Sequence, residues 1–262
     1  MKRLIIFIIS VLVILGLAYE IAHADIYGSS LVGWYTLDSS YISGTSVTDN
    51  SGNGNTGTTH NSPTQAVGII GQSILFVKTS SQYVTIADAS VQRPNNITVC
   101  AWVNFASLPA NNSYFSIVSK AYSGPPWTSP YVAYLLRAEN ISNNRYIEFD
   151  VGNGTSYSND RTSFTPVVHK WYDFCMTYDG THKLDYVNAV LKSTDNASQI
   201  TGNIGYGTSH ATVIGADIGA SPAQDYFDGS IDDVRIYNRA LSGAEVQQLY
   251  YQSLARHSSN PL

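Results

Sequence analysis

The sequence predicts an all-β protein, built as a β-sandwich of two antiparallel sheets with one short helix near the C-terminus. The 262 residues are 44% hydrophobic, which is enough apolar material to form a sizeable core. Short segments rich in β-branched and aromatic residues recur along the chain between clusters of Gly, Asn, Ser and Pro. Many short strands without intervening helices indicate a sandwich or a barrel rather than an α/β fold.

Segments of four to nine residues carry this strand pattern. The expected strands are 31–36, 73–77, 83–87, 97–105, 114–120, 131–138, 145–151, 171–178, 183–191, 211–214 and 229–237. In the fourth of these, Ile97 and Val99 share one face, while Cys100 and Trp102 share the other. Because both faces carry apolar side chains, we expect this strand to be covered on both sides.

The helix signal lies at the end of the chain. Ser242 and Glu245 have the spacing of a capping box, and Val246, Leu249 and Tyr250 follow as an apolar stripe at helical spacing. We expect this helix to end near residue 254. The simplest organisation is a single domain over residues 25–254, followed by a frayed tail over residues 255–262.

The N-terminus has the layout of a secretory signal peptide over residues 1–24. A short basic start precedes an apolar run over residues 4–17, and Ala22 and Ala24 supply the small residues of a cleavage site. The alternative is an uncleaved anchor that extends to Ile21, although Glu20 falls inside such a span. Cleavage predicts a protein that is secreted or held at the cell surface, without membrane insertion.

Charge and aromatic content narrow the class of partner. Lys plus Arg number 14 and Asp plus Glu 19, so the formal net charge is -5, and no basic cluster stands out. This mildly acidic balance argues against a nucleic acid partner. Tyrosine is abundant, with 19 residues, while charged residues make up only 13%. Aromatic faces stack on sugar rings, so the composition favours a glycan or glycoprotein partner.

Several segments together resemble one known family. They are 32–37, 49–55, 97–105, 171–180 and the closing segment 227–242, in that order along the chain. The ordered set resembles the laminin-G-like, concanavalin A-like jellyroll domains. The resemblance implies two curved antiparallel sheets packed face to face. It leaves the function open, because this fold carries lectins, adhesion modules, carbohydrate-binding domains and glycosidases.

The two cysteines add to this resemblance. Cys100 and Cys175 occupy positions similar to the two strand cysteines that pentraxins bridge. The resemblance therefore implies a Cys100–Cys175 disulfide, which an exported chain can form in an oxidising compartment. The alternative is a pair of free cysteines buried in the core.

An Asp/Asn/Gly loop is the candidate metal site. Asp49, Ser51, Asn53 and Asn55 place oxygen atoms at the spacing found in the first half of a calcium loop. The glutamate that closes such a loop is missing, so another part of the fold must complete the shell. The alternative is a polar turn in which Asp49 accepts hydrogen bonds from backbone amides.

Asp232 is the expected completing carboxylate. Alternation places it on the same face as the apolar Val234 and Ile236, where a carboxylate needs a metal or another polar partner. The resemblance supports calcium, because laminin-G-like domains commonly hold this ion. The alternative is that Asp232 accepts hydrogen bonds from backbone amides.

A proline-stiffened loop and the hairpin after it form the candidate ligand-binding surface. We expect Tyr122, Trp127 and Tyr131 to present aromatic rings, and Arg137 and Asp150 to bond sugar hydroxyls. The alternative is that the prolines only shape a long loop whose Trp127 covers a sheet edge.

Catalysis is not the expected function. Jellyroll glucanases carry three carboxylates on one strand face, whereas here Glu148 and Asp150 supply two and the third is absent. The sequence thus predicts a secreted, non-catalytic carbohydrate-binding or adhesion domain that calcium stabilises. The alternatives are a glycan-active hydrolase or lyase, and a structural component of a cell surface.

Overall fold

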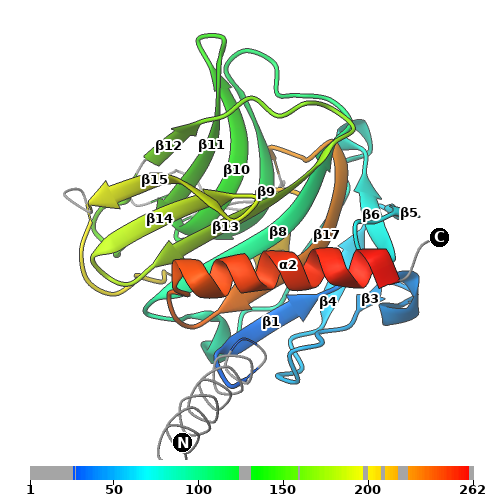
Figure 1. Cartoon of the computed structure of the whole chain (residues 1–262), viewed down its shortest axis with the longest axis horizontal. Helices are drawn as coiled ribbons and strands as arrows, with labels where there is room; N and C mark the ends of the chain where they lie inside the picture. The colour runs from blue at the N-terminus through cyan, green and yellow to red at the C-terminus, as the bar shows by residue number, and fades with distance from the viewer. Residues whose placement is uncertain are drawn as a thin grey trace, which may run out of the picture.

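The computed structural model describes residues 26, 28–123, 131–158, 160–196, 200–207, 210–217 and 224–259. In these ranges the chain forms two antiparallel sheets that face each other, with one long helix outside the sandwich (Figure 1). The predicted jellyroll sandwich is confirmed. The predicted signal peptide lies outside the described residues. Within the described ranges, no helix has the length and apolar character needed to cross a bilayer.

The first sheet has the strand order β15-β14-β13-β8-β17-β6-β5, and β1 also pairs with β17. Its strands are β1 (Leu31–Tyr35), β5 (Thr64–Val67), β6 (Gln72–Phe76), β8 (Ile97–Phe105), β13 (Trp171–Tyr178), β14 (His182–Val187), β15 (Val190–Asn196) and β17 (Gly229–Tyr237).

The second sheet has the order β12-β11-β10-β9-β16-β7-β4-β3-β2. Its strands are β2 (Ile42–Ser43), β3 (Ser46–Val47), β4 (Gly57–His60), β7 (Tyr83–Ile86), β9 (Ser113–Ala121), β10 (Val132–Ile141), β11 (Asn144–Val151), β12 (Asp160–Ser163) and β16 (Thr212–Ile214). Three short 3₁₀ turns, η1 (Ser39–Tyr41), η2 (Lys78–Ser80) and η3 (Ser90–Gln92), join strands at the edges.

The core lies between the two sheets. Alternate residues of each strand point inward, so Val103 and Phe105 of β8 face Phe115 of β9 across a continuous apolar cluster. Phe105 packs on Phe227 with ring centroids 5.3 Å apart, and both rings are fully buried. Each such side chain contributes about 1.5–3 kcal/mol to the stability of the fold.

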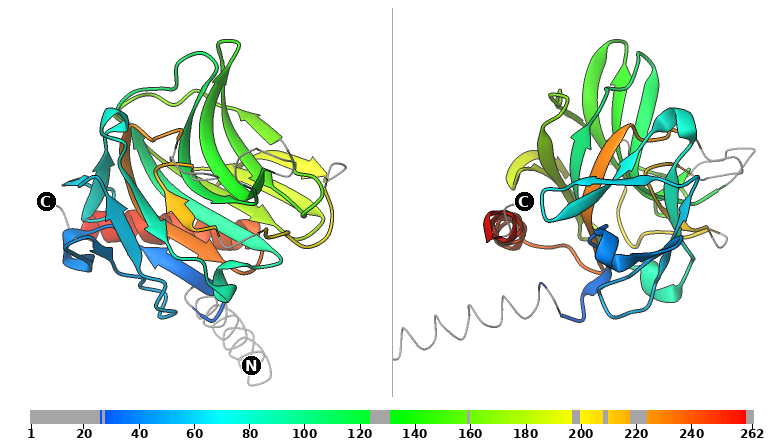
Figure 2. Two further views of the ribbon diagram at one scale, coloured as in Figure 1. Left: turned by 180° about the vertical axis from the view of Figure 1, so that it is seen from behind. Right: turned by 90° about the vertical axis from the view of Figure 1, so that its right-hand side faces the viewer.

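Helix α2 (Gly243–Ser259) covers the outer face of the first sheet, where it crosses β8 and β17 (Figures 1 and 2). The ring of Tyr250 stacks on Trp102, with centroids 5.3 Å apart, so β8 is covered on both sides as its sequence predicts. The capping box is confirmed, because the amide of Ser242 donates to Glu245 and the amide of Glu245 donates to Ser242 Oγ.

The helix is longer than its sequence indicates. It continues to Ser259, so the expected frayed tail from residue 255 is wrong over its first five residues (255–259). The guanidinium of Arg256 lies 5.5 Å from the ring centre of Trp34, a contact with β1 that holds the last turn in place. A cation near a helix C-terminus is also favourable for the helix dipole.

Some expected strands differ in the structure. Residues 183–191 do not form one strand, because Asn188 and Ala189 adopt positive φ angles and turn the chain between β14 and β15. Strands β2 to β5 and β12 do not appear among the expected strands, because they are polar or short and lack the apolar alternation of the others.

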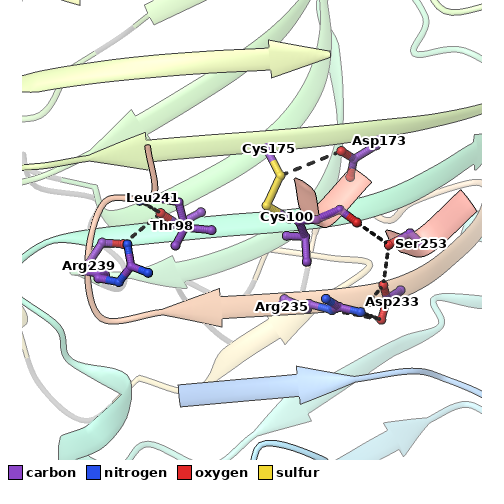
Figure 3. The surroundings of a disulfide bond; sticks show 10 residues. Thr98, Cys100, Asp173, Cys175, Asp233, Arg235, Arg239, Leu241 and Ser253 are labelled. Carbon is purple, nitrogen blue, oxygen red and sulfur yellow. Dashed lines mark hydrogen bonds and ion pairs between the residues drawn. A yellow bond between two sulfur atoms is a disulfide. The ribbon is translucent and has the colours of Figure 1, made fainter. Parts of the chain in front are cut away.

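The two cysteines form a disulfide, as predicted. Cys100 of β8 and Cys175 of β13 lie directly opposite each other in the register of the two strands. Figure 3 shows that the bridge lies beside Thr98 and Asp173, on the face of the sheet where helix α2 packs. The apolar side chains of Val246 and Leu249 complete its surroundings.

Candidate functional site

The outer face of the second sheet carries an unusual density of buried polar side chains. Leu136 and Ala138 of β10 face the core, so the residues between them and beside them face outward. Arg137 lies opposite Glu148 of β11, and Glu148 in turn lies opposite Arg161 of β12. Strands β9 to β12 thus carry charged side chains on the outer face of the sheet and apolar side chains on the face toward the core.

A pocket of about 230 Å³ opens on this face. Its lining combines three tyrosine rings with acidic, amide and guanidinium groups and a small apolar floor: Tyr114, Tyr131, Tyr157, Arg137, Asp150, Asp217, Gln224, Asp225, Val132 and Leu135. The ring of Tyr131 is 39% exposed and meets Tyr157 edge to face, with centroids 5.3 Å apart. The pocket therefore offers both aromatic surface and hydrogen-bonding groups.

A ring of ion pairs supports one wall of the pocket. Arg137 Nε lies 2.5 Å from Glu148 Oε2, and its Nη2 lies 3.9 Å from Glu139 Oε2. Arg161 bonds to Glu139 and also approaches Glu148 Oε1 at 3.8 Å. Both glutamates are fully buried. The guanidinium of Arg137 lies 4.0 Å from the ring centre of Tyr114, so it is fixed from two sides.

Burial in this cluster disfavours the charged form of the carboxyls. Desolvation, with the nearby charge of Glu148, raises the pKa of Glu139 to about 7. The same two causes raise the pKa of Asp150 well above its ordinary value. Burial also raises the pKa of Asp225, which Arg137 partly offsets. Burial and like charge thus make it easier for these carboxyls to take up a proton than for exposed ones.

Asp217, Gln224 and Asp225 also line the pocket, and no pattern in the sequence singles them out. Asp217 and Gln224 exchange backbone hydrogen bonds of 2.9 and 2.8 Å, which fixes the ends of this loop at the pocket. Asp225 has a φ of 52°, a left-handed conformation that a residue other than glycine rarely adopts. Tyr114 and Tyr157 were also missed, since an isolated tyrosine in a tyrosine-rich chain carries no positional signal.

The predicted ligand-binding residues divide into three groups. Tyr131, Arg137 and Asp150 line the pocket together. The amide of Tyr122 donates to the carbonyl of Tyr131, but Tyr122 is not among the described residues that line the pocket. Trp127 lies outside the described residues.

The Asp49 loop bonds to the backbone around it. Asp49 Oδ1 accepts hydrogen bonds from the amides of Trp34 and Ser51, and Oδ2 accepts one from the amide of Asn55. The side-chain amides of Asn53 and Asn55 donate to carbonyls of β1, while Asn53 also donates to Ser51 Oγ. These contacts are those of the polar turn that the sequence left as the alternative to a metal loop.

Asp232 lies elsewhere, and on the opposite face from the one expected. A β-bulge between Asp232 and Arg235 shifts the register, so Ile231 joins Val234 on the core face and Asp232 lies opposite Trp102 on the outer face. The expectation that Asp232 shares the face of Val234 and Ile236 is therefore wrong. A single-residue bulge reverses the alternation without leaving a mark in the sequence.

Asp232 accepts hydrogen bonds from the backbone of a neighbouring turn through one carboxylate oxygen only. Its Oδ2 accepts hydrogen bonds from the amides of Ile69 and Ile70, but the buried Oδ1 has no hydrogen-bond partner. Asp38 reaches the same turn, since its Oδ1 accepts a hydrogen bond of 2.6 Å from the amide of Gln72. Carboxylate oxygens such as these are hard donors of the kind that calcium prefers. No pattern in the sequence singles out Asp38.

Glycines make room for these two carboxylates. A Cβ at Gly68 would lie 2.5 Å from Asp232 Oδ2, and a Cβ at Gly71 would lie 2.5 Å from Asp38 Oδ1. Gly71 also has a φ of 67°. Both positions therefore require glycine, because any side chain there would collide with one of the two carboxylates.

Comparison with known families agrees with this geometry. A family model described as the concanavalin A-like lectin/glucanases superfamily matches residues 78–247, which is more than half of the chain. The protein belongs to this superfamily. The matched region of this concanavalin A-like domain contains strands β8 to β17, the disulfide and the pocket. No curated protein matches the chain significantly.

Solved structures share the fold. Domain 4 of an extracellular GH43 arabinanase from Geobacillus stearothermophilus, determined with arabinotriose, is 21% identical with a TM-score of 0.61, and the match covers 84% of this chain and 98% of that domain. The binding domain of Paraclostridial Mosquitocidal Protein 1 is 12% identical with a TM-score of 0.63, covering 87% and 53%. The binding domain of botulinum neurotoxin DC, in complex with SialylT, is 14% identical with a TM-score of 0.62, covering 87% and 52%.

The chain spans about half the length of the two toxin domains and nearly all of the arabinanase domain. At these identities the likeness concerns the fold of the concanavalin A-like domain.

Proposed function

We propose that this protein is a carbohydrate-binding domain that acts outside the cell or at its surface, and that its pocket holds one sugar residue of a glycan. The observation that carries the proposal is the pocket lining, which places the rings of Tyr131 and Tyr157 beside Asp150 and Arg137. An aromatic wall suits the apolar face of a sugar ring, and the polar groups suit its hydroxyls. The arabinanase domain and the toxin domain, both determined with glycans, support the same class of ligand.

Export is supported by the disulfide and by the N-terminal sequence. A bridge between Cys100 and Cys175 persists in an oxidising compartment, which agrees with a leader over residues 1–24. Adhesion to a glycoprotein is one use of such a domain, since the pocket requires only an accessible sugar residue.

Replacement of Tyr131 by alanine tests the pocket. We expect Tyr131→Ala to weaken binding of the preferred glycan about tenfold, because the variant loses the aromatic face that contacts the sugar. Isothermal titration calorimetry should follow a glycan array that covers arabino-, xylo-, gluco- and chito-oligosaccharides and sialylated glycans. The melting temperature should stay within a few degrees, since the ring is 39% exposed.

Tyr41 provides a matched control for this variant. It is 40% exposed and belongs to η1 rather than to the pocket, so Tyr41→Ala should leave glycan affinity unchanged. Failure of every glycan on the array to bind would remove the proposed function. Equal affinity of the Tyr131→Ala variant and the wild type would place the site elsewhere.

Hydrolysis is the second candidate, because Glu139, Glu148 and Asp150 share one face of the second sheet. A retaining or inverting site needs two carboxyls that flank a sugar in an open cleft. Here both glutamates are fully buried and each is near two arginines, so binding is the better supported function. A reducing-end assay on the same glycans separates the two, since turnover that Glu139→Gln abolishes would favour the hydrolase.

We also propose that calcium stabilises the fold at the turn between Gly68 and Gly71, with Asp38 and Asp232 as ligands. Calcium added to chelator-treated protein should raise the melting temperature. At about 100 times the dissociation constant the gain is about 2.7 kcal/mol, which corresponds to about 5–10 °C. Asp232→Asn should abolish this shift, because it removes the charge on the buried oxygen that has no hydrogen-bond partner.

Asp49→Asn serves as the matched control. It disturbs the loop that the sequence first suggested as a calcium site, so the protein should become less stable while the calcium-dependent shift persists. If Asp49→Asn lost the calcium-dependent rise in melting temperature and Asp232→Asn kept it, the calcium site would lie in the Asp49 loop instead. Absence of any shift in the wild type would remove calcium from the proposal.

A further inference from the structure

A stacked pair of rings lies on the second sheet away from the pocket. His60 of β4 and Tyr83 of β7 stack with centroids 4.3 Å apart and an interplanar angle of 10°. Tyr226 approaches Tyr83 at 6.1 Å with a tilt of 40°. All three side chains are half-buried, so each retains some exposed surface. We call these three residues the aromatic platform.

The platform lies on the same face of the sheet as the pocket. Val84 and Ile86 of β7 point into the core, so Tyr83 and Thr85 point outward, and His60 lies opposite Tyr83. The register then connects the two sites, because Thr85 pairs with Val213, Val213 with Ser119, and Ser119 with Leu135 at the pocket floor.

The chain after the pocket leads directly to the platform. Asp225 lines the pocket, and its carbonyl accepts a hydrogen bond of 2.8 Å from the amide of Ser116 in β9. Phe227 donates to Gly215 at 2.9 Å and its ring is buried in the core. Tyr226, between them, points outward to Tyr83. Three strand spacings separate β10 from β7, which is about 14 Å.

The platform is uncharged and its geometry is fixed. Burial lowers the pKa of His60, so the imidazole is neutral at pH 7. His60 Nε2 lies 2.8 Å from Thr85 Oγ1, a hydrogen bond that holds the ring parallel to Tyr83. Neutral aromatic faces attract the C–H faces of sugar rings and carry no charge that would select an anionic ligand.

The size of the pocket requires a second surface for a longer ligand. Its volume of about 230 Å³ lies below the ~300–1,000 Å³ of sites that enclose drug-sized molecules, so it suits a single sugar ring. The remainder of an oligosaccharide must leave the pocket and cross the outer face of the sheet. The platform is an aromatic surface on this face, and it begins one residue after the pocket wall.

We propose that His60, Tyr83 and Tyr226 form a second sugar-binding subsite, which receives the following residues of an oligosaccharide whose first residue occupies the pocket. The proposal rests on the proposed function, since it needs a glycan in the pocket. The ligand is then a chain of several uncharged sugar residues rather than a lone monosaccharide.

The test is the dependence of affinity on chain length, measured by isothermal titration calorimetry. The probes are arabino-, xylo-, gluco- and chito-oligosaccharides from monosaccharide to hexasaccharide. In the best-binding series, the wild type should bind the longer members about tenfold more tightly than the monosaccharide. Tyr83→Ala should remove most of this gain and leave monosaccharide affinity unchanged, whereas Tyr83→Phe should retain the gain because it keeps the ring.

Tyr251 provides the control, because it is an exposed tyrosine of helix α2 against the other sheet, and Tyr251→Ala should bind every probe like the wild type. Length-independent affinity in the wild type, or an unchanged gain in both Tyr83→Ala and His60→Ala, would overturn the subsite while leaving the pocket in place. Failure of the wild type to bind any of these probes would overturn the subsite, and the proposed function falls with it only if the sialylated glycans of the array also fail to bind.

Discussion

Removal of the disulfide should lower the free energy of unfolding by about 4 kcal/mol, one of the two largest stability effects that the structure predicts. The bridge between Cys100 and Cys175 closes a loop of 75 residues, so it restricts the unfolded chain strongly. We expect the double variant Cys100→Ala, Cys175→Ala to melt about 10–15 °C below the wild type, measured by circular dichroism or calorimetry.

Reduction of the wild type gives the matching control. A thiol reductant should lower the melting temperature of the wild type toward that of the double variant and leave the variant itself unaffected. Serine is a poorer replacement, because two hydroxyls would be buried among Val246, Leu249 and Tyr237. Two free thiols in the native, unreduced protein would contradict the bridge, as would equal melting temperatures of variant and wild type.

The sequence predicted the fold well where one pattern decides it. Strands β8, β13 and β17 have the bounds expected from their apolar content, and the capping box of Ser242 and Glu245 places the start of helix α2. These elements are buried along most of their length, so burial requires apolar side chains in a pattern that the sequence displays directly. The disulfide followed from the resemblance of both cysteines to the two strand cysteines that pentraxins bridge.

The site was harder to predict, because it depends on contacts between distant segments. The predicted residues Arg137 and Asp150 share the pocket lining because β10 and β11 form one hairpin, and Tyr131 directly precedes β10. Asp217 and Asp225 come from a loop that reaches the same pocket only after β16 pairs with β9. The bulge between Asp232 and Arg235 inserts one extra residue into β17. The inward and outward alternation before the bulge is therefore opposite to the one expected from the residues after it, and Asp232 lies on the outer face.

A second large effect on stability should come from Asp173, a carboxyl buried under helix α2. It lies opposite Trp102 in the register of β13 and β8, and only 4% of the residue is exposed. Desolvation, with the nearby charge of Asp233, raises the pKa of Asp173 to about 8, although Arg235 opposes this. Arg235 is already engaged, because its Nη2 lies 2.9 Å from Asp233 Oδ2. We therefore expect Asp173 to be largely protonated in the native protein at neutral pH.

Stability should thus fall as the pH rises from about 4 to about 8, because the unfolded chain releases the proton of Asp173 near its ordinary pKa of about 3.9 while the folded chain retains it. Asp173→Asn removes this dependence and keeps the shape of the side chain. The variant should exceed the wild type in stability by about 4 kcal/mol at pH 7, with little difference at pH 3.

Urea unfolding at several pH values measures both curves. Asp179→Asn is the control, because the exposed Asp179 has a pKa below its ordinary value. Desolvation is the largest single effect and raises this pKa, but the hydrogen bonds from His182 and Thr181 and the charge of His182 together outweigh it. That variant should lose stability at pH 7 rather than gain it. A constant difference between Asp173→Asn and the wild type from pH 3 to pH 8 would mean that Asp173 has the same pKa in the folded and the unfolded chain, which would contradict the predicted effect of its burial.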